Sequence, residues 1–331
     1  MRISSGPTTL GEAGYRTAYV GKWHLSGEPQ GNRWVPPDRR AGFGDFVGWE
    51  SPHVDHWAGR IWRDDPASSQ PSPEELPMPG HETDALTDMA IEKVEELASQ
   101  AVPFCFFLAY QAPHPPCSPP TEFEALYANE VPRLPNLPDR PPAYKKPEWK
   151  AEYSNDEFRR PYWGEVSHLD AAAGRFLDAA EALGLFDSSV IVFTSDHGEM
   201  AGARGRYGKW VMFEESVRVP LLVSVPGQPA TGRRARDLIS TVDFLPTFSE
   251  IAGANPPADL PGVSFARRWR TLAGAGDPAA AGPRRYAFLR PRATESGRNR
   301  RAARRRGSVA RGTPGLVGHQ HGSRYPGGLS L

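Results

Sequence analysis

The sequence has 331 residues, 39 of them basic and 39 acidic, so its formal net charge is zero. Hydrophobic residues make up 39% and charged residues 24%, which is typical of a soluble globular protein with one large domain or two ordinary ones. The composition excludes a disulfide scaffold, because there are only two cysteines. It also excludes a membrane-spanning protein, because no uncharged run approaches the roughly 18 to 20 apolar residues of a transmembrane helix.

The first hundred residues predict a short helix, a strand, an irregular region and a second helix, in that order. A short helix begins near Leu10, and a strand follows from Arg16 and ends at Lys22-Trp-His24. Residues 26–80 are rich in Gly, Pro and Trp and show no sustained period, so they predict no regular element. Residues 84–98 carry apolar side chains at three- and four-residue spacing, which predicts an amphipathic helix.

The middle of the chain continues the alternation of strands and helices. Residues 104–109 predict a buried strand, and the eleven prolines between 113 and 147 predict an extended surface segment. A helix is expected over 163–183, with Gly184 as its C-cap. Buried strands over 190–194 and 220–225 and a short helix over 243–252 follow. The alternation favours an α/β fold with a mostly parallel central sheet flanked by helices.

The end of the chain differs in charge from the rest. Residues 284–331 contain twelve arginines, no lysine and a single acid, which leaves 27 basic and 38 acidic residues in 1–283. We therefore predict a folded domain over 1–280 and an Arg/Gly-rich, disordered basic tail over 281–331. Three interpretations of the tail stay open: disorder without a partner, translation in a wrong reading frame of a GC-rich gene, and nucleic-acid binding, which is the least favoured.

Two predicted strands are followed by candidate ligand-binding side chains. Open α/β sheets bind ligands beyond the carboxyl ends of their strands. Lys22 and His24 lie two residues apart and project from the same face, which suits an anion. Asp196 and His197 follow the strand over 190–194 and are candidate ligands of a divalent metal. Each pair also has a simpler interpretation. Lys22 and His24 would be an exposed lysine and a histidine with satisfied hydrogen bonds, and Asp196 would be a helix-capping residue at the start of a loop.

Two further candidates are weak signals when each is taken alone. His114 lies between Pro113 and Pro115, which restrict its backbone. Lys209 follows a glycine-containing loop and by itself is interpreted as a surface lysine. The order of the segments around these residues is more specific than any one of them.

Six segments occur in the order found in a known enzyme family. Residues 14–25, GYRTAYVGKWHL, closely resemble the second signature of the sulfatase family, in the alkaline phosphatase superfamily. Further matches are GFGDF (42–46), PFCFFLAYQAPHP (103–115), VIVFTSDHGE (190–199), Lys209 with EESVRVPL (214–221), and DFLPTF (243–248). The resemblance covers about residues 10–265 and implies an alkaline phosphatase-like fold and the hydrolysis of a small-molecule sulfate ester.

The resemblance also implies a role for each candidate that would contact the substrate. Lys22 and Lys209 would hold sulfate oxygens and neutralise the charge that develops during transfer. His24 would lie beside the nucleophile, and His114 would contact the sulfate and assist the leaving oxygen. Sulfate is a compact anion with little acid–base chemistry of its own, so catalysis by positioned cations is physically reasonable.

The cofactors that the resemblance implies are supported less completely. Asp196 and His197 would bind the divalent cation, usually Ca²⁺, that polarises the sulfate. The family's nucleophile is a Cys or Ser that is converted to formylglycine within a Cys/Ser-x-Pro-x-Arg motif, and this motif does not occur in the sequence. Cys117-Ser-Pro-Pro-Thr121 lacks the arginine and lies after His114, so we interpret it as unrelated. The family's paired acidic metal ligands near its N-terminus have no counterpart either.

These departures lead to an expectation about the chain as written. We expect a fragment that is incomplete at the N-terminus, and also at the C-terminus, where the resemblance fades after Phe265. The first residues lack the apolar segment of a signal peptide, which predicts a cytoplasmic protein. We expect it to hydrolyse aryl sulfates no faster than a Lys22→Ala variant. Two alternatives stay open: a phosphodiester or phosphonate-ester hydrolase of the same superfamily, and a non-catalytic anion-binding remnant.

Overall fold

A computed structural model describes most of the chain up to residue 269. The described residues are 6–26, 33–50, 53–134, 136–137, 156–227, 232, 234–267 and 269. The predicted domain boundary at residue 280 and the predicted tail over 281–331 lie outside them. No helix in this described part combines the length and apolar character needed to cross a bilayer.

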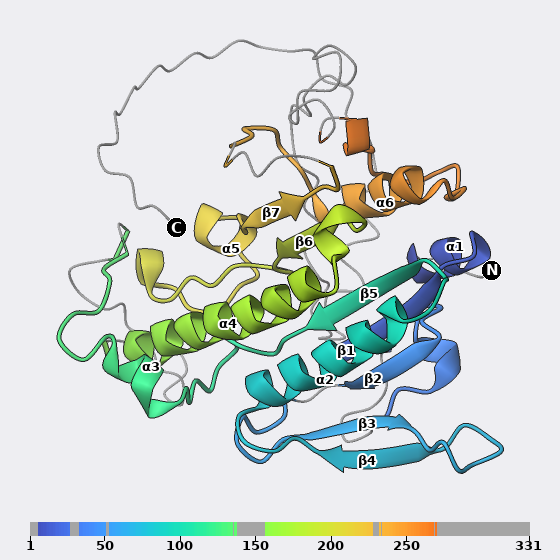
Figure 1. The fold of residues 1–331 in the computed structure, drawn as a ribbon. Helices are drawn as coiled ribbons and strands as arrows, with labels where there is room; N and C mark the ends of the chain where they lie inside the picture. Colours follow the sequence, from blue (N-terminus) through green and yellow to red (C-terminus); the bar gives the residue numbers. More distant parts are fainter. Residues whose placement is uncertain are drawn as a thin grey trace, which may run out of the picture. The chain divides into compact units, whose positions relative to one another are not determined.

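The central sheet has five strands in the order β4-β3-β2-β1-β5 (Figure 1). Strand β1 (Arg16–Lys22) pairs in parallel with β2 (Asp45–Trp49) on one side and with β5 (Phe104–Ala109) on the other. Strands β3 (Arg60–Asp64) and β4 (Pro73–Pro77) extend the sheet in antiparallel fashion beyond β2. The sheet is therefore mixed, with a parallel centre, and the carboxyl ends of β1, β2 and β5 lie at one edge.

Three of these strands fall where the sequence predicts no regular structure. Strands β2, β3 and β4 all lie within residues 26–80, so that prediction is wrong there. The hydrophobic pattern is weak because β3 and β4 pair through charges as well as apolar contacts. Arg63 Nε lies 2.6 Å from Glu74 Oε2, and Arg60 Nε lies 2.5 Å from Glu75 Oε1. Opposite charges across a strand pair stabilise the pairing without leaving a hydrophobic period in the sequence.

A second sheet is formed by β6 (Ile191–Thr194) and β7 (Leu221–Ser224), which pair antiparallel. The predicted positions of both strands are confirmed, but their predicted burial is wrong. The side chains of Phe193 and Leu222 are 40% and 63% exposed. Within the described residues β6 pairs with β7 and not with the central sheet, so part of its apolar surface stays uncovered.

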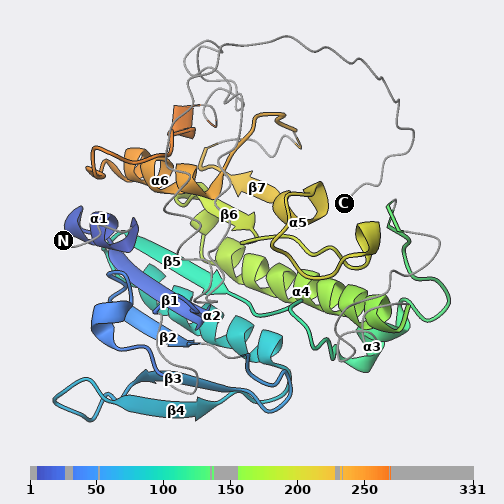
Figure 2. The same cartoon turned by 180° about the vertical axis from the view of Figure 1, so that it is seen from behind.

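The predicted helices are present with small differences at their ends. Helix α2 (Glu82–Ala98) and α4 (Asp156–Ala182) pack side by side, in front of the central sheet in Figure 1 and behind it in Figure 2. Helix α4 begins seven residues earlier than predicted. The shorter helices are α1 (Gly6–Glu12), α3 (Thr121–Ala125), α5 (Glu214–Val217) and α6 (Phe244–Ala252).

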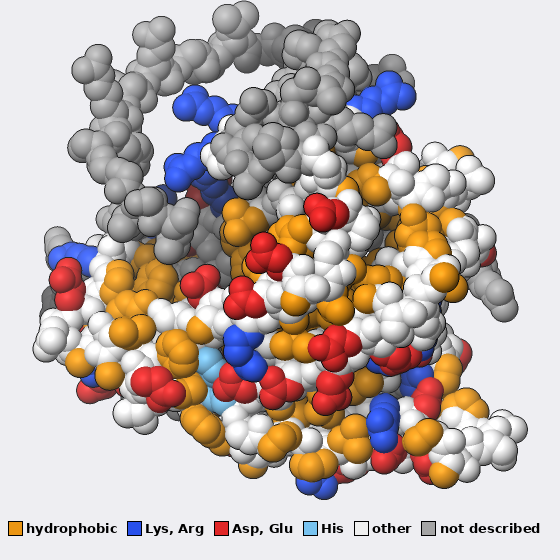
Figure 3. Space-filling model, in the orientation of Figure 1, with side chains coloured by type: hydrophobic (Ala, Val, Ile, Leu, Met, Phe, Trp, Pro, Cys, Tyr) orange, Lys and Arg blue, Asp and Glu red, His pale blue; other side chains and the backbone are white. Residues whose placement is uncertain are grey.

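The outer surface of the two long helices is acidic. Helix α2 carries six acidic side chains and a single lysine. In the space-filling view, acidic side chains gather over α2 and α4, with basic and apolar side chains between them (Figure 3). This distribution agrees with the excess of acids over bases in residues 1–283.

Neighbouring residues of β1 belong to two hydrophobic cores on opposite faces of the sheet. Val20 packs with Trp49, Ile61 and Leu86, the last of which comes from α2. Tyr19 points to the other face, as expected for the alternation of side chains along a strand. There it belongs to an aromatic cluster that consists of Tyr19, Trp23, Val35, Phe43 and Phe46. Burial on both faces fixes β1 tightly, and with it the residues at its carboxyl end.

Candidate functional site

The candidate site is built where β1, β2 and β5 end at the same edge of the sheet. Lys22 is the last residue of β1, and His24 follows two residues later. His53 lies four residues beyond the end of β2, and His114 lies five residues beyond the end of β5. Lys209 comes from the loop between β6 and β7.

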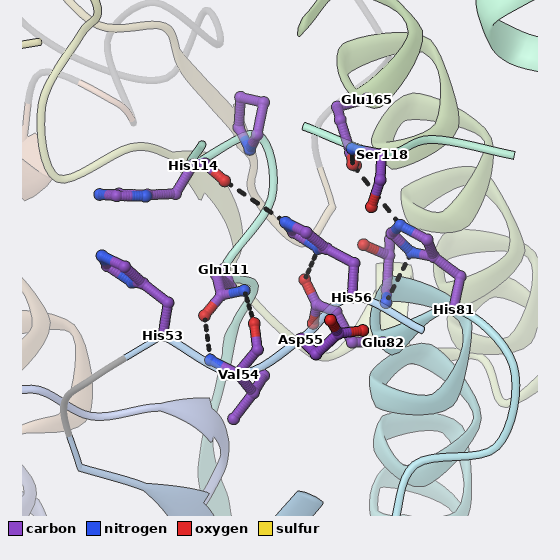
Figure 4. Close-up of polar contacts among 12 residues, drawn as sticks. His53, Val54, Asp55, His56, His81, Glu82, Gln111, His114, Ser118 and Glu165 are labelled. Carbon is purple, nitrogen blue, oxygen red and sulfur yellow. Dashed lines mark hydrogen bonds and ion pairs between the residues drawn. The ribbon is translucent and has the colours of Figure 1, made fainter. Parts of the chain in front are cut away.

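Two lysine–histidine contacts form the centre of the site. Lys22 Nζ lies 2.9 Å from His53 Nδ1, and Lys209 Nζ lies 3.1 Å from His114 Nε2. The two imidazole rings face each other, with their centroids 3.8 Å apart, and Figure 4 shows them side by side. We call Lys22, His53, His114 and Lys209 the Lys–His cluster. It joins four segments that are far apart in the sequence.

The electrostatics of the cluster keep its histidines neutral. Burial, with Lys22 as the next cause, lowers the pKa of His53 to about 3. Burial also lowers the pKa of His114 to about 4, in spite of an opposing hydrogen bond to Pro115. The pKa of Lys22 is lowered to about 8 by burial and by the charge of Lys209. At pH 7 Lys22 is therefore still mostly an ammonium, while both imidazoles are uncharged.

The hydrogen-bond partners define which nitrogen of each imidazole carries its proton. His114 Nδ1 lies 2.7 Å from the carbonyl oxygen of Pro115 and must donate to it, so His114 Nε2 accepts from Lys209. His53 Nδ1 accepts from Lys22, so its proton is on Nε2. An ammonium has three N–H groups, so a lysine can contact an imidazole and an anion at once. The cluster thus presents donors and positive charge, which is what a sulfate group requires.

The other predicted residues lie close enough to act on this cluster. The charge of Asp196 raises the pKa of Lys22, opposing the effect of burial, and His24 contributes to lowering the pKa of His53. His197 contributes in the same way to the low pKa of His114. The structure therefore brings together all six residues that the sequence singles out.

The predicted metal ligands form a pair that is incomplete for Ca²⁺. Asp196 Oδ2 lies 3.3 Å from His197 Nε2, and the Asp196 side chain is 83% exposed. A Cβ at Gly198 would lie 2.2 Å from the carbonyl oxygen of Glu215, so only glycine allows this close approach. Ca²⁺ takes about six to eight oxygen ligands. Among the described residues no third His, Cys, Asp or Glu joins the pair, so these residues alone do not fit Ca²⁺ and we assign no chemical step to a metal here.

The loop that carries Lys209 is held by the side chain of Glu199. Glu199 Oε1 accepts hydrogen bonds from the backbone N–H groups of Ala201 (3.1 Å) and Gly208 (2.5 Å), which closes the loop just before Lys209. The next residue, Trp210, has a positive φ of 74°, and its ring lies 5.5 Å from Lys209 Nζ. A positive φ is uncommon for a residue with a side chain and is concentrated at functional sites.

Sequence reasoning missed one member of the cluster, His53. It lies in the region that was predicted to have no regular structure, so no strand end marked it. Once β2 is known to lie beside β1, His53 is the first histidine after a strand that ends at the ligand-binding edge. The position of His53 after a strand of the parallel centre is therefore the feature from which it could have been predicted.

Comparison with known families agrees with this geometry. The family model described as Sulfatase matches residues 5–254, which is most of the chain. The chain belongs to the sulfatase family. The match contains the whole Lys–His cluster and the Asp196–His197 pair. It confirms the predicted family and fold class, whereas the roles of the individual residues stay predictions.

Individual relatives share about a quarter to a third of their residues with this sulfatase-family chain. It is 25% identical to the N-acetylglucosamine-6-O-sulfatase of Bacteroides thetaiotaomicron over 328 residues, covering 78% of this chain and 55% of the relative. It is 31% identical to the ulvan-active sulfatase of Formosa agariphila over 254 residues, covering 75% and 46%. The chain therefore spans about half the length of these curated relatives.

A solved structure supports the fold. The crystal structure of the sulfatase-like protein yidJ from Bacteroides fragilis superposes with a TM-score of 0.67 at 23% identity. The superposition covers 82% of this chain and 60% of that one. At this level of identity the likeness concerns the alkaline phosphatase-like fold, with its mixed sheet and flanking helices.

Proposed function

We propose that the Lys–His cluster binds the sulfate group of sulfate esters, which is the binding step of a sulfuric ester hydrolase. One observation carries the proposal: two lysine side chains from different segments converge on a pair of neutral imidazoles, 3.8 Å apart and tilted by 35°, at the ligand-binding edge of the sheet. Membership in the sulfatase family and the names of the curated relatives support it.

The cluster suits the charge that develops when a sulfate ester is cleaved. Negative charge accumulates on the sulfate oxygens and on the leaving oxygen, and positioned cations in a partly buried site stabilise it. Lys22 and Lys209 would supply the positive charge, and His53 Nε2–H would donate a hydrogen bond. His114 Nε2 accepts a hydrogen bond from the Lys209 ammonium, so it would connect the leaving oxygen to Lys209 as the source of a proton. His24 would occupy the side of the site next to the end of β1.

The experiment that tests this proposal is a titration of the purified 331-residue chain with sulfate. We expect one sulfate to bind per chain and to raise the melting temperature, compared with chloride at the same ionic strength. The same sample, assayed with nitrophenyl esters, also tests the expectation that this chain hydrolyses aryl sulfates no faster than its Lys22→Ala variant. No binding of sulfate would contradict the proposal. Tight binding of phosphate with turnover of a phosphonate or phosphate diester would favour the alternative hydrolase of the same superfamily.

The pH dependence of sulfate binding follows from the pKa of Lys22. Because this pKa is lowered to about 8, the ammonium is present below that pH and is lost as the pH rises through it. We expect the association constant to be nearly constant between about pH 6 and 7 and to fall by up to about tenfold per pH unit above pH 8. Calorimetry across this range measures it. A Lys22→Met variant should bind weakly with a flatter profile, and an unchanged profile in that variant would show that another group titrates.

A further inference from the structure

A second group of titratable side chains lies beside the segment that carries His53. His56, His81, Glu82 and Glu165 are each no more than 2% exposed, and we call them the buried His–Glu cluster. His56 precedes β3, His81 and Glu82 begin α2, and Glu165 comes from α4. Figure 4 shows the four side chains turned towards one another. The Lys–His cluster does not use any of them.

The backbone between His53 and His56 is fixed by two hydrogen bonds. The side chain of Gln111, which is 4% exposed, accepts a hydrogen bond from Val54 N at 3.0 Å and donates one to Val54 O at 2.9 Å. His53 and His56 lie on either side of Val54 along the chain, and both approach His114: the His53 ring lies 3.8 Å from its ring, and His56 Nε2 lies 3.4 Å from its carbonyl oxygen (Figure 4). The two clusters are therefore neighbours that share no side chain but meet at the backbone of His114.

The polar atoms of the buried His–Glu cluster converge without satisfying one another. His56 Nδ1 lies 3.2 Å from Glu82 Oε1, and His81 Nε2 lies 3.5 Å from Glu165 Oε1. The ligand atoms of His56, His81 and Glu165 all lie within 4.8 Å of one another. Yet several buried atoms lack a hydrogen-bond partner in the structure, namely His56 Nδ1, His81 Nε2, both carboxylate oxygens of Glu82, and Glu165 Oε2. Buried polar atoms without partners are rare in native proteins and require an explanation.

We propose that the buried His–Glu cluster is a binding site for a divalent transition metal, with Zn²⁺ the best match. His56, His81 and Glu165 offer two nitrogens and one carboxylate oxygen within 4.8 Å of one another, and Glu82, 3.2 Å from His56 Nδ1, is the candidate for a fourth ligand; together they make a donor set of the kind that Zn²⁺ takes. Zn²⁺ bonds of about 2.0 to 2.1 Å place tetrahedral ligand atoms about 3.3 to 3.4 Å apart. The His56–Glu82 and His81–Glu165 contacts, at 3.2 and 3.5 Å, are close to that separation, and the other distances among His56, His81 and Glu165 are at most 4.8 Å, so a bound ion would draw these atoms together. The two nitrogen donors disfavour Ca²⁺ and Mg²⁺, which prefer oxygen.

The balance of charge favours the same conclusion. Glu82 and Glu165 are both 0% exposed, and burying two uncompensated carboxylates is very costly. One divalent cation neutralises both and leaves both imidazoles neutral. Without an ion, protons at the His56–Glu82 and His81–Glu165 contacts have to supply this compensation, in a site where the two imidazole rings are stacked 5.1 Å apart. A single ion supplies the positive charge at one point and satisfies the unpartnered atoms together.

The surroundings of His56 are those of a metal-binding histidine. Its second nitrogen, Nε2, lies 3.4 Å from the carbonyl oxygen of His114, and a ligating imidazole commonly donates its other N–H to such an oxygen. Glu165 Oε1 accepts a hydrogen bond from Ser118 N at 3.0 Å. Both contacts reach the loop that carries His114, so an ion at this site would also fix that loop.

The competing structure is a pair of proton-bridged His–Glu contacts without an ion. In it, His81 Nδ1 accepts the 3.3 Å hydrogen bond from Thr83 N, and the proton on Nε2 points at Glu165. When metal binds Nε2, the proton of His81 moves to Nδ1 and the contact with Thr83 N is lost. The two structures therefore differ in metal content and in the His81 tautomer.

The test is metal binding by the full-length chain after treatment with a chelator. We expect one Zn²⁺ per chain, replaceable by Co²⁺ with the intense visible absorption of a tetrahedral site. X-ray absorption should show nitrogen and oxygen ligands only. Re-adding Zn²⁺ should also raise the melting temperature of the stripped protein. Glu165→Gln should weaken the binding by at least about a hundredfold, because it replaces a charged ligand.

Two controls separate this site from others. His168→Gln is the matched control, because His168 is also 2% exposed and its ring lies 4.6 Å from His81, but its Nε2 contacts Asp84. His168→Gln and Asp196→Asn should both keep the Zn²⁺. The proposal is overturned if the wild-type chain binds no stoichiometric Zn²⁺ or Co²⁺, if the bound ion has thiolate ligands, or if Asp196→Asn abolishes binding. These readouts use the wild-type chain first, so they hold even where a variant fails to fold.

Discussion

Replacing Lys22 by methionine is expected to weaken sulfate binding by about ten- to a hundredfold at pH 7, because a hydrogen bond to a charged group contributes about 1.5 to 3 kcal/mol. Methionine keeps most of the volume of the side chain and removes only its charge. The lysine is partly buried and lies next to a second cation, so little solvent screens its contact with an anion. Calorimetric titration of wild type and variant with sulfate gives the two affinities directly.

The stability of the same variant distinguishes loss of a ligand contact from loss of the fold. Burial lowers the pKa of Lys22, so its ammonium opposes folding near neutral pH, and Lys22→Met should unfold no more easily than wild type. Lys93→Met is the control, because Lys93 pairs with Glu96 on the surface of α2 and should bind sulfate normally. Lys209→Met should resemble Lys22→Met. Wild-type affinity in both cluster variants would mean that the anion binds elsewhere.

The candidate residues that could be predicted share one property: each follows a strand or loop whose local sequence is distinctive. Lys22 is the last residue of an apolar strand and His24 follows it, and Asp196 and His197 come shortly after another apolar strand. His53 could not be found in this way, because β2 and the strands after it have few consecutive apolar residues. Its place in the site depends on β2 lying beside β1, which is a property of the sheet and not of the local sequence.

The buried His–Glu cluster shows a different limit. His56, His81 and Glu165 are separated by 25 and 84 residues, and no short metal-binding spacing connects them. They meet only because α2 and α4 pack together against the segment before β3. Strand β6 shows a third limit. Its position follows from its apolar sequence, but its antiparallel pairing with β7 does not. Local pattern predicts elements, whereas the pairing of distant elements decides which side chains share a site.

The Gly21→Ala substitution is expected to lower the free energy of unfolding by about 2 to 5 kcal/mol, the sum of an overpacked contact and a strained backbone. Gly21 has a φ of 121°, and a Cβ there would lie 2.0 Å from the carbonyl oxygen of Ala109, its partner in the β1–β5 pair. That oxygen belongs to the backbone, so it cannot move aside without opening the sheet at its ligand-binding edge. Urea unfolding measures the loss.

Gly14→Ala provides the matched control for this substitution. Gly14 also has a positive φ, 90°, but a Cβ there would meet nothing within 4 Å, so only backbone strain of about 1 to 2 kcal/mol is expected. Because Gly21 directly precedes Lys22, Gly21→Ala should also displace the ammonium and weaken sulfate binding, whereas Gly14→Ala should leave it unchanged. Equal destabilisation by the two alanines would contradict the close contact. Loss of both stability and binding in Gly21→Ala, beside loss of binding alone in Lys22→Met, would show that the tight β1–β5 pairing holds Lys22 in the site.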